Sequence, residues 1–216
     1  MGRARSHLDT DDSMLTQGYV RIDGDGHRGA TEARVRMNQE SRGRLYVAAA
    51  AIAAVAGVVG TVIQLTNPTF DSEFTTTVDW VNEVTFTLFI AASMVAMWGM
   101  VREQIASRVG GMVFIAGQGL LLAGMLPGFA LGYSPDWFVV VGLPGNLLAL
   151  IGMTLIAVYS WRRRTLPRVI AALLPLSVLI GIGAAEFGGG VVTAIVWGAI
   201  AMRLSESTTE VAAATA

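Results

Sequence analysis

Arginine clusters and long uncharged apolar runs alternate along this chain of 216 residues. All 15 basic residues are arginines. Beyond the N-terminal tail they lie just before the first apolar run, between the second and third, between the fourth and fifth, and after the sixth, while the intervening loops contain none. Because arginine is retained on the cytoplasmic side of a membrane during insertion, this alternation predicts six membrane spans with both termini in the cytoplasm.

The apolar runs approach or exceed the length that a bilayer requires, about 20 helical residues for a hydrocarbon core of about 30 Å. The chain is 53% hydrophobic, with a mean hydropathy of +0.57. We therefore predict an all-α membrane protein, a compact bundle of six transmembrane helices arranged as three helical hairpins. The predicted spans are Leu45–Leu65, Val81–Val101, Val109–Leu131, Phe138–Trp161, Val169–Ala185 and Phe187–Leu204.

The last two spans are separated by one charged residue, Glu186. A single helix over residues 169–204 would be about 54 Å long, nearly twice the hydrocarbon thickness. The glycines at 188–190 offer a flexible turn beside Glu186, and Arg168 and Arg203 belong on the same side of the membrane. The pattern thus favours two short crossings joined by a tight hairpin.

The polar ends of the chain define its predicted domains. Residues 1–43 lack helical or strand periodicity and are predicted to be a disordered cytoplasmic tail, residues 44–204 the transmembrane domain, and residues 205–216 a short cytoplasmic tail. The first tail has a second interpretation, because Met14 or Met37 could start the protein and much of the tail would then precede its true beginning.

Three absences exclude classes of chemistry. The chain has no cysteine, so it forms no disulfide and offers no thiolate ligand to zinc or iron–sulfur clusters. It has no lysine, so it cannot hold retinal as a Schiff base. Both histidines, His7 and His27, lie in the N-terminal tail, so no span offers an imidazole ligand to a b-type haem. We expect no cofactor and no metal site.

The second span contains the densest group of polar residues. Asp79, Asn82 and Glu83 share a helical face, and Thr87 continues that face one turn deeper. Two interpretations remain open. The group could form a site for a proton, a cation or a ligand, or it could be a solvated helix start whose carboxylates are favoured by the helix dipole.

Two further polar residues complete the set of candidate ligand- or ion-binding residues. Gln118 lies near the middle of the third span, where an amide most often hydrogen-bonds a neighbouring helix. Glu186 lies in the turn between the last two spans, where a solvated loop charge is the simpler interpretation.

Small residues mark the predicted helix contacts. Gly124, Gly128 and Gly132 recur every four residues on one face of the third span, which would let another helix approach backbone to backbone. The alanine-rich stretch at residues 48–56 of the first span offers a similarly smooth surface. We predict that both surfaces pack against other helices.

The sequence predicts function less closely than topology. We favour a non-enzymatic multi-pass protein of the cytoplasmic membrane, either a structural or accessory subunit or a component that binds or transports a small molecule. The alternative is a small intramembrane enzyme acting on a lipid or isoprenoid, with Glu83 and Asp79 as acid and base. The expected partners are membrane lipids, with a homo-oligomer or a larger membrane complex left open, and no nucleic acid or nucleotide, because the chain has no corresponding motif.

Overall fold

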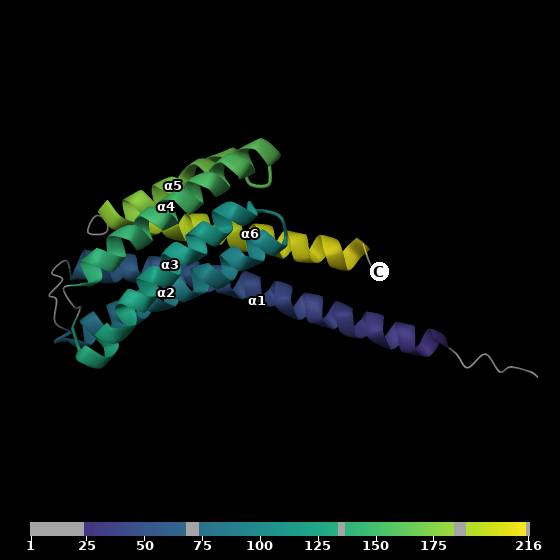
Figure 1. Cartoon of the computed structure of the whole chain (residues 1–216), viewed down its shortest axis with the longest axis horizontal. Coiled ribbons are helices and arrows are strands. Elements are labelled where there is room, and N and C mark those ends of the chain that lie inside the picture. Colours follow the sequence, from purple (N-terminus) through teal and green to yellow (C-terminus); the bar gives the residue numbers. More distant parts are fainter. Residues whose placement is uncertain (1–23, 68–73, 134–136, 184–188, 215–216) are drawn as a thin grey trace, which may run out of the picture. The chain divides into compact units, whose positions relative to one another are not determined.

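The computed structural model describes residues 24–67, 74–133, 137–183 and 189–214, and within these ranges the secondary structure is helical with no strand (Figure 1). The predicted all-α fold class is confirmed. The helices are α1 (Gly24–Thr66), α2 (Thr77–Arg102), α3 (Arg108–Leu131), α4 (Phe138–Arg163), α5 (Arg168–Gly183) and α6 (Gly190–Ala214). Among the described residues, four helical stretches are long and apolar enough to cross a membrane: Met37–Thr66, Thr77–Arg102, Arg108–Leu131 and Val140–Arg163.

The chain forms two compact units, residues 1–38 and 39–216. In the first unit, residues 24–38 are helical and begin α1, which continues in the second unit to Thr66. For residues 24–43 this differs from the disordered tail predicted from the sequence. These residues include alanine, arginine, glutamate and methionine, which favour helices, and an existing helix extends more easily than a new one nucleates. Residues 1–23 lie outside the described part of the chain.

The stretch predicted as the fifth and sixth spans forms two helices, α5 and α6, rather than one long helix. With 16 residues, α5 is shorter than the roughly 20 residues that cross a bilayer at right angles. The second helix begins at Gly190, later than predicted, and continues past Leu204 to Ala214. Glu186, in the predicted turn, lies outside the described residues.

Local hydrogen bonds fix where the helices begin. At the start of α2, the Thr76 hydroxyl accepts a hydrogen bond from the backbone N–H of Asp79 at 3.2 Å, and the Asp79 carboxylate accepts one from the Thr76 N–H at 2.8 Å. At the start of α3, the Ser107 hydroxyl accepts a hydrogen bond from the Gly110 N–H at 3.1 Å. Each cap satisfies backbone groups that would otherwise have no partner.

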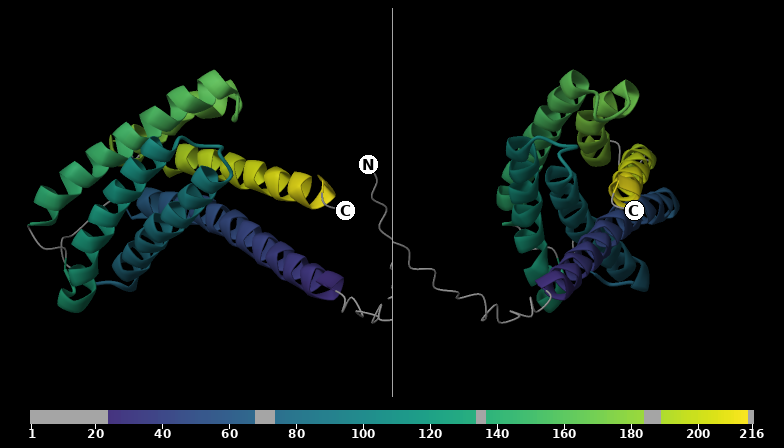
Figure 2. Two further views of the ribbon diagram at one scale, coloured as in Figure 1. Left: turned by 45° about the vertical axis from the view of Figure 1, so that its right-hand side comes forward. Right: turned by 90° about the vertical axis from the view of Figure 1, so that its right-hand side faces the viewer.

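Helices α2 to α6 pack in sequence, α2 along α3, α3 along α4, α4 along α5 and α5 along α6 (Figure 2). Ala49, Ala50, Ala53 and Ala56 of α1 are buried, which agrees with the packing role predicted for residues 48–56. The largest fully buried side chains are Trp197, Phe114, Ile90, Met97, Met100, Met153, Ile156, Leu174, Ile200 and Leu204. Exposed valines and leucines cover the outer faces, as expected where a helix meets lipid.

The two ends of the bundle differ in charge. We call the end that carries Arg102, Arg108, Arg163 and Arg168 the arginine end, and the opposite end, near Thr66, Thr77, Leu131, Phe138 and Gly190, the arginine-free end. At the arginine end, the Thr165 hydroxyl donates a hydrogen bond to the Ile105 carbonyl at 2.8 Å and ties the α4–α5 connection to the α2–α3 connection.

Candidate functional site

A cavity of about 350 Å³ lies among the helices of the second unit. Its volume is near the lower end of the range of small-molecule sites, about 300 to 1,000 Å³. All six helices contribute to the wall. The lining residues are Ala56, Gly57, Gly60, Thr61, Gln64, Asn82, Thr85, Phe86, Phe89, Phe114, Gln118, Leu121, Phe138, Asn146, Met153, Ser177, Val178, Gly181, Gly190, Thr193 and Trp197.

The cavity extends from the middle of the bundle toward the arginine-free end. Gln118 lies near the middle of α3, whereas Gln64 lies in the last turn of α1 and Asn82 in the second turn of α2. None of the described lining residues is an arginine. A molecule that enters from the arginine-free end would therefore meet polar groups before it reaches the bundle centre.

The polar groups of the lining are uncharged. They comprise four carboxamides and four hydroxyls, from Gln64, Asn82, Gln118, Asn146, Thr61, Thr85, Ser177 and Thr193. A carboxamide both donates and accepts hydrogen bonds, whereas a carboxylate would only accept and would carry a charge. No Asp, Glu, Arg or His belongs to the described lining. The cavity therefore suits a neutral molecule with several hydrogen-bonding groups.

Gln118 is the polar group that most clearly lacks a protein partner. The residue is 5% exposed, and its buried Oε1 atom accepts no hydrogen bond from the described protein atoms. A buried acceptor left without a donor costs about 1–3 kcal/mol. A hydrogen-bond donor supplied by a molecule in the cavity would remove this cost.

Three of the lining hydroxyls are oriented by bonds to backbone carbonyls. Thr61 donates to the Gly57 carbonyl at 2.8 Å, Ser177 to the Leu174 carbonyl at 2.7 Å, and Thr193 to the Ser177 carbonyl at 3.3 Å. Because a hydroxyl has one hydrogen and two lone pairs, each of these oxygens can still accept a hydrogen bond. The bond from Thr193 to Ser177 also links α6 to α5.

Aromatic side chains form much of the apolar wall. Trp197 and Phe114 are each 1% exposed, with ring centroids 6.0 Å apart. Phe89 meets Trp197 edge to face, with centroids 6.3 Å apart. Such contacts hold large flat side chains in fixed orientations, and they give the cavity rigid surfaces against which a flat or apolar part of a ligand can pack.

Gln118→Leu is expected to preserve the fold and to stabilise the ligand-free protein by up to about 1–3 kcal/mol, because leucine removes the unpaired buried acceptor at similar volume. Thermal unfolding in detergent measures this change. Ser93→Ala is the matched control, because Ser93 is fully buried outside the lining and its hydroxyl already donates to the Ile90 carbonyl at 2.8 Å. A clear loss of stability in Gln118→Leu would show that the amide makes a stabilising bond within the protein.

The structure places the predicted residues of the second span in three different environments. Asn82 lines the cavity, as Gln118 does from α3. Asp79 is part of the cap at the start of α2, which agrees with the helix-start interpretation. Glu83 is partly buried and forms no ion pair or side-chain hydrogen bond with described residues, and Thr87 has a buried hydroxyl without a partner. Neither Glu83 nor Thr87 lines the cavity.

Helix geometry explains why Glu83 is outside the site. Successive residues of an α-helix point about 100° apart. The cavity face of α2 is formed by Asn82, Thr85, Phe86 and Phe89, at spacings of three, four and seven residues. Glu83 lies about 100° around the helix from Asn82, beyond the edge of the arc that these four residues span. The predicted group on α2 consequently does not act as one site in the structure.

Several lining residues were not singled out from the sequence. Gln64, Asn146, Ser177 and Thr193 are isolated polar residues in apolar helices, and each comes from a different helix. Their shared signal is a polar side chain within a predicted span, which is costly unless it faces protein or water. Only the tertiary structure shows that they face one cavity.

The predicted glycine face divides into two roles. At Gly124, an added Cβ would lie 3.0 Å from the Phe138 ring, and at Gly128 it would lie 3.3 Å from the Tyr133 carbonyl. Gly132 differs from the prediction, because an added Cβ would meet nothing within 4 Å. Its φ of 73° ends α3 in the left-handed conformation, which glycine adopts without strain.

The tightest backbone contacts between α3 and α4 involve other glycines. A Cβ at Gly117 would lie 2.6 Å from the Gly145 carbonyl oxygen, and a Cβ at Gly152 would lie 2.5 Å from the Phe114 nitrogen. In each helix the glycines at this contact recur at a seven-residue spacing, Gly110 and Gly117 in α3 and Gly145 and Gly152 in α4. This spacing keeps them on one face.

Comparison with protein-family models, curated proteins and solved structures finds no match for this chain.

Proposed function

We propose that the chain is a multi-pass protein of the cytoplasmic membrane whose cavity binds a small uncharged molecule, as a binding or transport component. The main support for this proposal is the buried Oε1 atom of Gln118, which has no hydrogen-bond partner among the described residues. This atom lies at a cavity of about 350 Å³ that is lined by uncharged polar groups from all six helices. The expected ligand donates at least one hydrogen bond and has an apolar surface that packs against Phe89, Phe114 and Trp197.

We further propose that α1 to α6 are six membrane spans with both termini in the cytoplasm. The four long apolar stretches and the collection of loop arginines at one end of the bundle support this arrangement. The shorter α5 fits a local hydrophobic thickness below average or a position partly shielded by α4 and α6, both of which it contacts. In this topology the cavity extends toward the outer leaflet.

Binding is favoured over catalysis by the composition of the lining. General acid–base catalysis requires a titratable group within hydrogen-bond distance of the substrate, and the described lining contains no carboxylate and no imidazole. Asp79 is engaged in the cap of α2, and Glu83 does not line the cavity. The intramembrane-enzyme alternative based on these two residues is therefore not our proposal.

Cysteine accessibility tests whether solutes reach the cavity. The chain has no cysteine, so Asn146→Cys introduces a single reactive thiol into the lining. We expect methyl methanethiosulfonate to modify this thiol in the purified protein within minutes. Ser93→Cys is the matched control, because position 93 is fully buried and outside the lining, and we expect it to remain unmodified.

The same thiol reports on the ligand. We would test whether neutral solutes protect the thiol of Asn146→Cys from modification by methyl methanethiosulfonate. The panel comprises nucleobases, carboxamides and polyols. A solute that binds should slow modification, and adding Gln118→Leu should weaken that protection about tenfold, the effect of losing one buried hydrogen bond. If Asn146→Cys reacts no faster than Ser93→Cys, solutes do not reach the cavity, and a structural subunit becomes the better proposal.

A further inference from the structure

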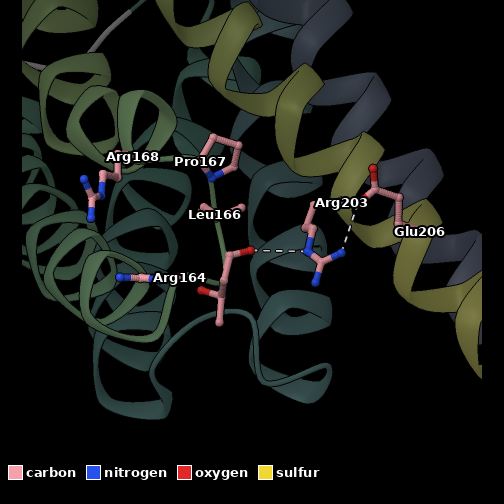
Figure 3. Close-up of a pocket in the computed structure, with 7 residues that line it drawn as sticks. Arg164, Leu166, Pro167, Arg168, Arg203 and Glu206 are labelled. Atoms are coloured by element: carbon pink, nitrogen blue, oxygen red, sulfur yellow. Dashed lines mark hydrogen bonds and ion pairs between the residues drawn. The ribbon is translucent and has the colours of Figure 1, made fainter.

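A second pocket lies at the arginine end of the bundle, where the α4–α5 connection approaches α6 (Figure 3). Its volume is about 530 Å³. The charged residues of its lining are three arginines, Arg164, Arg168 and Arg203, and one carboxylate, Glu206. The excess of guanidinium groups makes this pocket attractive to anions, in contrast to the uncharged cavity.

Arg203 is held in place by two interactions. Its Nε donates a hydrogen bond to the Thr165 carbonyl at 3.2 Å, and a terminal nitrogen pairs with the Glu206 carboxylate at 2.9 Å. A guanidinium group has five N–H donors, so several remain for another acceptor. Figure 3 shows Arg203 and Glu206 on one side of the connecting segment, with Arg164 and Arg168 on the other.

Arg164 and Arg168 are exposed and form no ion pair with the described residues. Arg164 ends α4 with a φ of 57°, a left-handed conformation that is uncommon for residues other than glycine. The chain thus carries a charged side chain where glycine would fit with less strain. The pocket therefore has two guanidinium groups free to bind an anion, and a third fixed nearby.

The surroundings of the pocket point to a lipid as the source of that anion. The Arg168 guanidinium lies over the Trp161 ring, 5.6 Å from its centroid, and Trp161 is half exposed at the end of α4. Tryptophan at the end of a span is typical of the membrane interface, where phospholipid headgroups lie. Exposed apolar residues on the same two helices, Val158 and Val169, offer a surface for acyl chains.

We propose that this pocket binds the headgroup phosphate of an anionic phospholipid, with Arg164 and Arg168 as its direct ligands and Arg203 adding positive charge. Arginine suits this role because its planar N–H groups can contact two phosphate oxygens at once. This site is separate from the proposed solute cavity, which shares none of its lining residues.

Native mass spectrometry of the full chain, with phosphatidylglycerol and phosphatidylcholine of the same acyl chains, tests the proposal. We expect the wild type to retain phosphatidylglycerol preferentially. Arg164→Gln with Arg168→Gln should weaken that binding about thirtyfold, since each arginine near an anionic lipid contributes about a factor of five. Arg162→Gln with Arg163→Gln is the matched control, with the same charge change in residues that do not line the pocket, and it should weaken binding less than about threefold.

A second variant keeps the test decisive if the double variant fails to fold. Glu206→Gln removes the only negative charge of the described lining and should tighten phosphatidylglycerol binding about fivefold. Equal losses in the two double variants would show diffuse charge attraction and overturn the proposal, as would unchanged binding in Glu206→Gln. Thermal stabilisation by inorganic phosphate without any by phosphatidylglycerol would assign the pocket to a soluble anion and also overturn it.

Discussion

Gly152→Ala is expected to lower the free energy of unfolding by about 1–3 kcal/mol, the usual cost of forcing an extra methyl group into a packed interior. At this position an added Cβ would lie 2.5 Å from the Phe114 nitrogen and 2.8 Å from the Gly110 carbonyl oxygen. Both neighbours are backbone atoms of α3, so the helices themselves must separate to make room. Thermal unfolding in detergent, followed by tryptophan fluorescence, measures the effect.

Gly198→Ala is the matched control for this prediction. It makes the same chemical change within a helix, but an added Cβ at Gly198 would meet nothing within 4 Å. Because alanine favours helix over glycine by about 1 kcal/mol, this variant should be as stable as the wild type or slightly more stable. Similar losses in both variants would mean that glycine flexibility, rather than close packing of α3 against α4, explains the effect.

The sequence predicted the helices better than their contacts. A run of about 20 apolar residues is a local property, and the first four predicted spans each lie within one helix. Helix contacts depend on which face meets which neighbour. The four-residue repeat of Gly124, Gly128 and Gly132 identified one set of glycines. The closest backbone contacts between α3 and α4 instead involve glycines that recur every seven residues within each helix, among them Gly117 in α3 and Gly152 in α4. A single sequence does not rank such patterns.

The candidate site was predicted only in part for a similar reason. Gln118 and Asn82 were candidates because polar residues in apolar helices are costly, and both line the cavity. Grouping Asn82 with Asp79 and Glu83 assumed that the polar face of α2 is the functional face. In the structure, the face of α2 that carries Asn82 lines the cavity. The other polar groups of the lining come from residues distant in the sequence, such as Asn146 and Thr193. Their convergence requires the tertiary fold.

The proposed topology predicts which side of the membrane each loop faces, and labelling of a loop cysteine should be either present or absent in intact cells. Because the chain has no cysteine, a membrane-impermeant maleimide will label only the single cysteine that is introduced. Thr75 is exposed two residues before α2 at the arginine-free end, and Thr75→Cys should be labelled in intact cells. Ser205→Cys is exposed on α6 just beyond Arg203, and it should be labelled only after the membrane is opened. Buried Ser93→Cys controls for labelling through the bundle.

The number of spans depends on whether α5 and α6 cross the membrane, and one further cysteine decides this. Glu186 lies in the connection between these helices, outside the described residues. If the chain has six spans, Glu186→Cys should be labelled in intact cells, like Thr75→Cys. If α5 and α6 returned without crossing, Glu186→Cys would react only after permeabilisation, like Ser205→Cys. That result would leave four crossings, and Ser177 and Thr193 would then line the cavity from helices that do not cross the membrane.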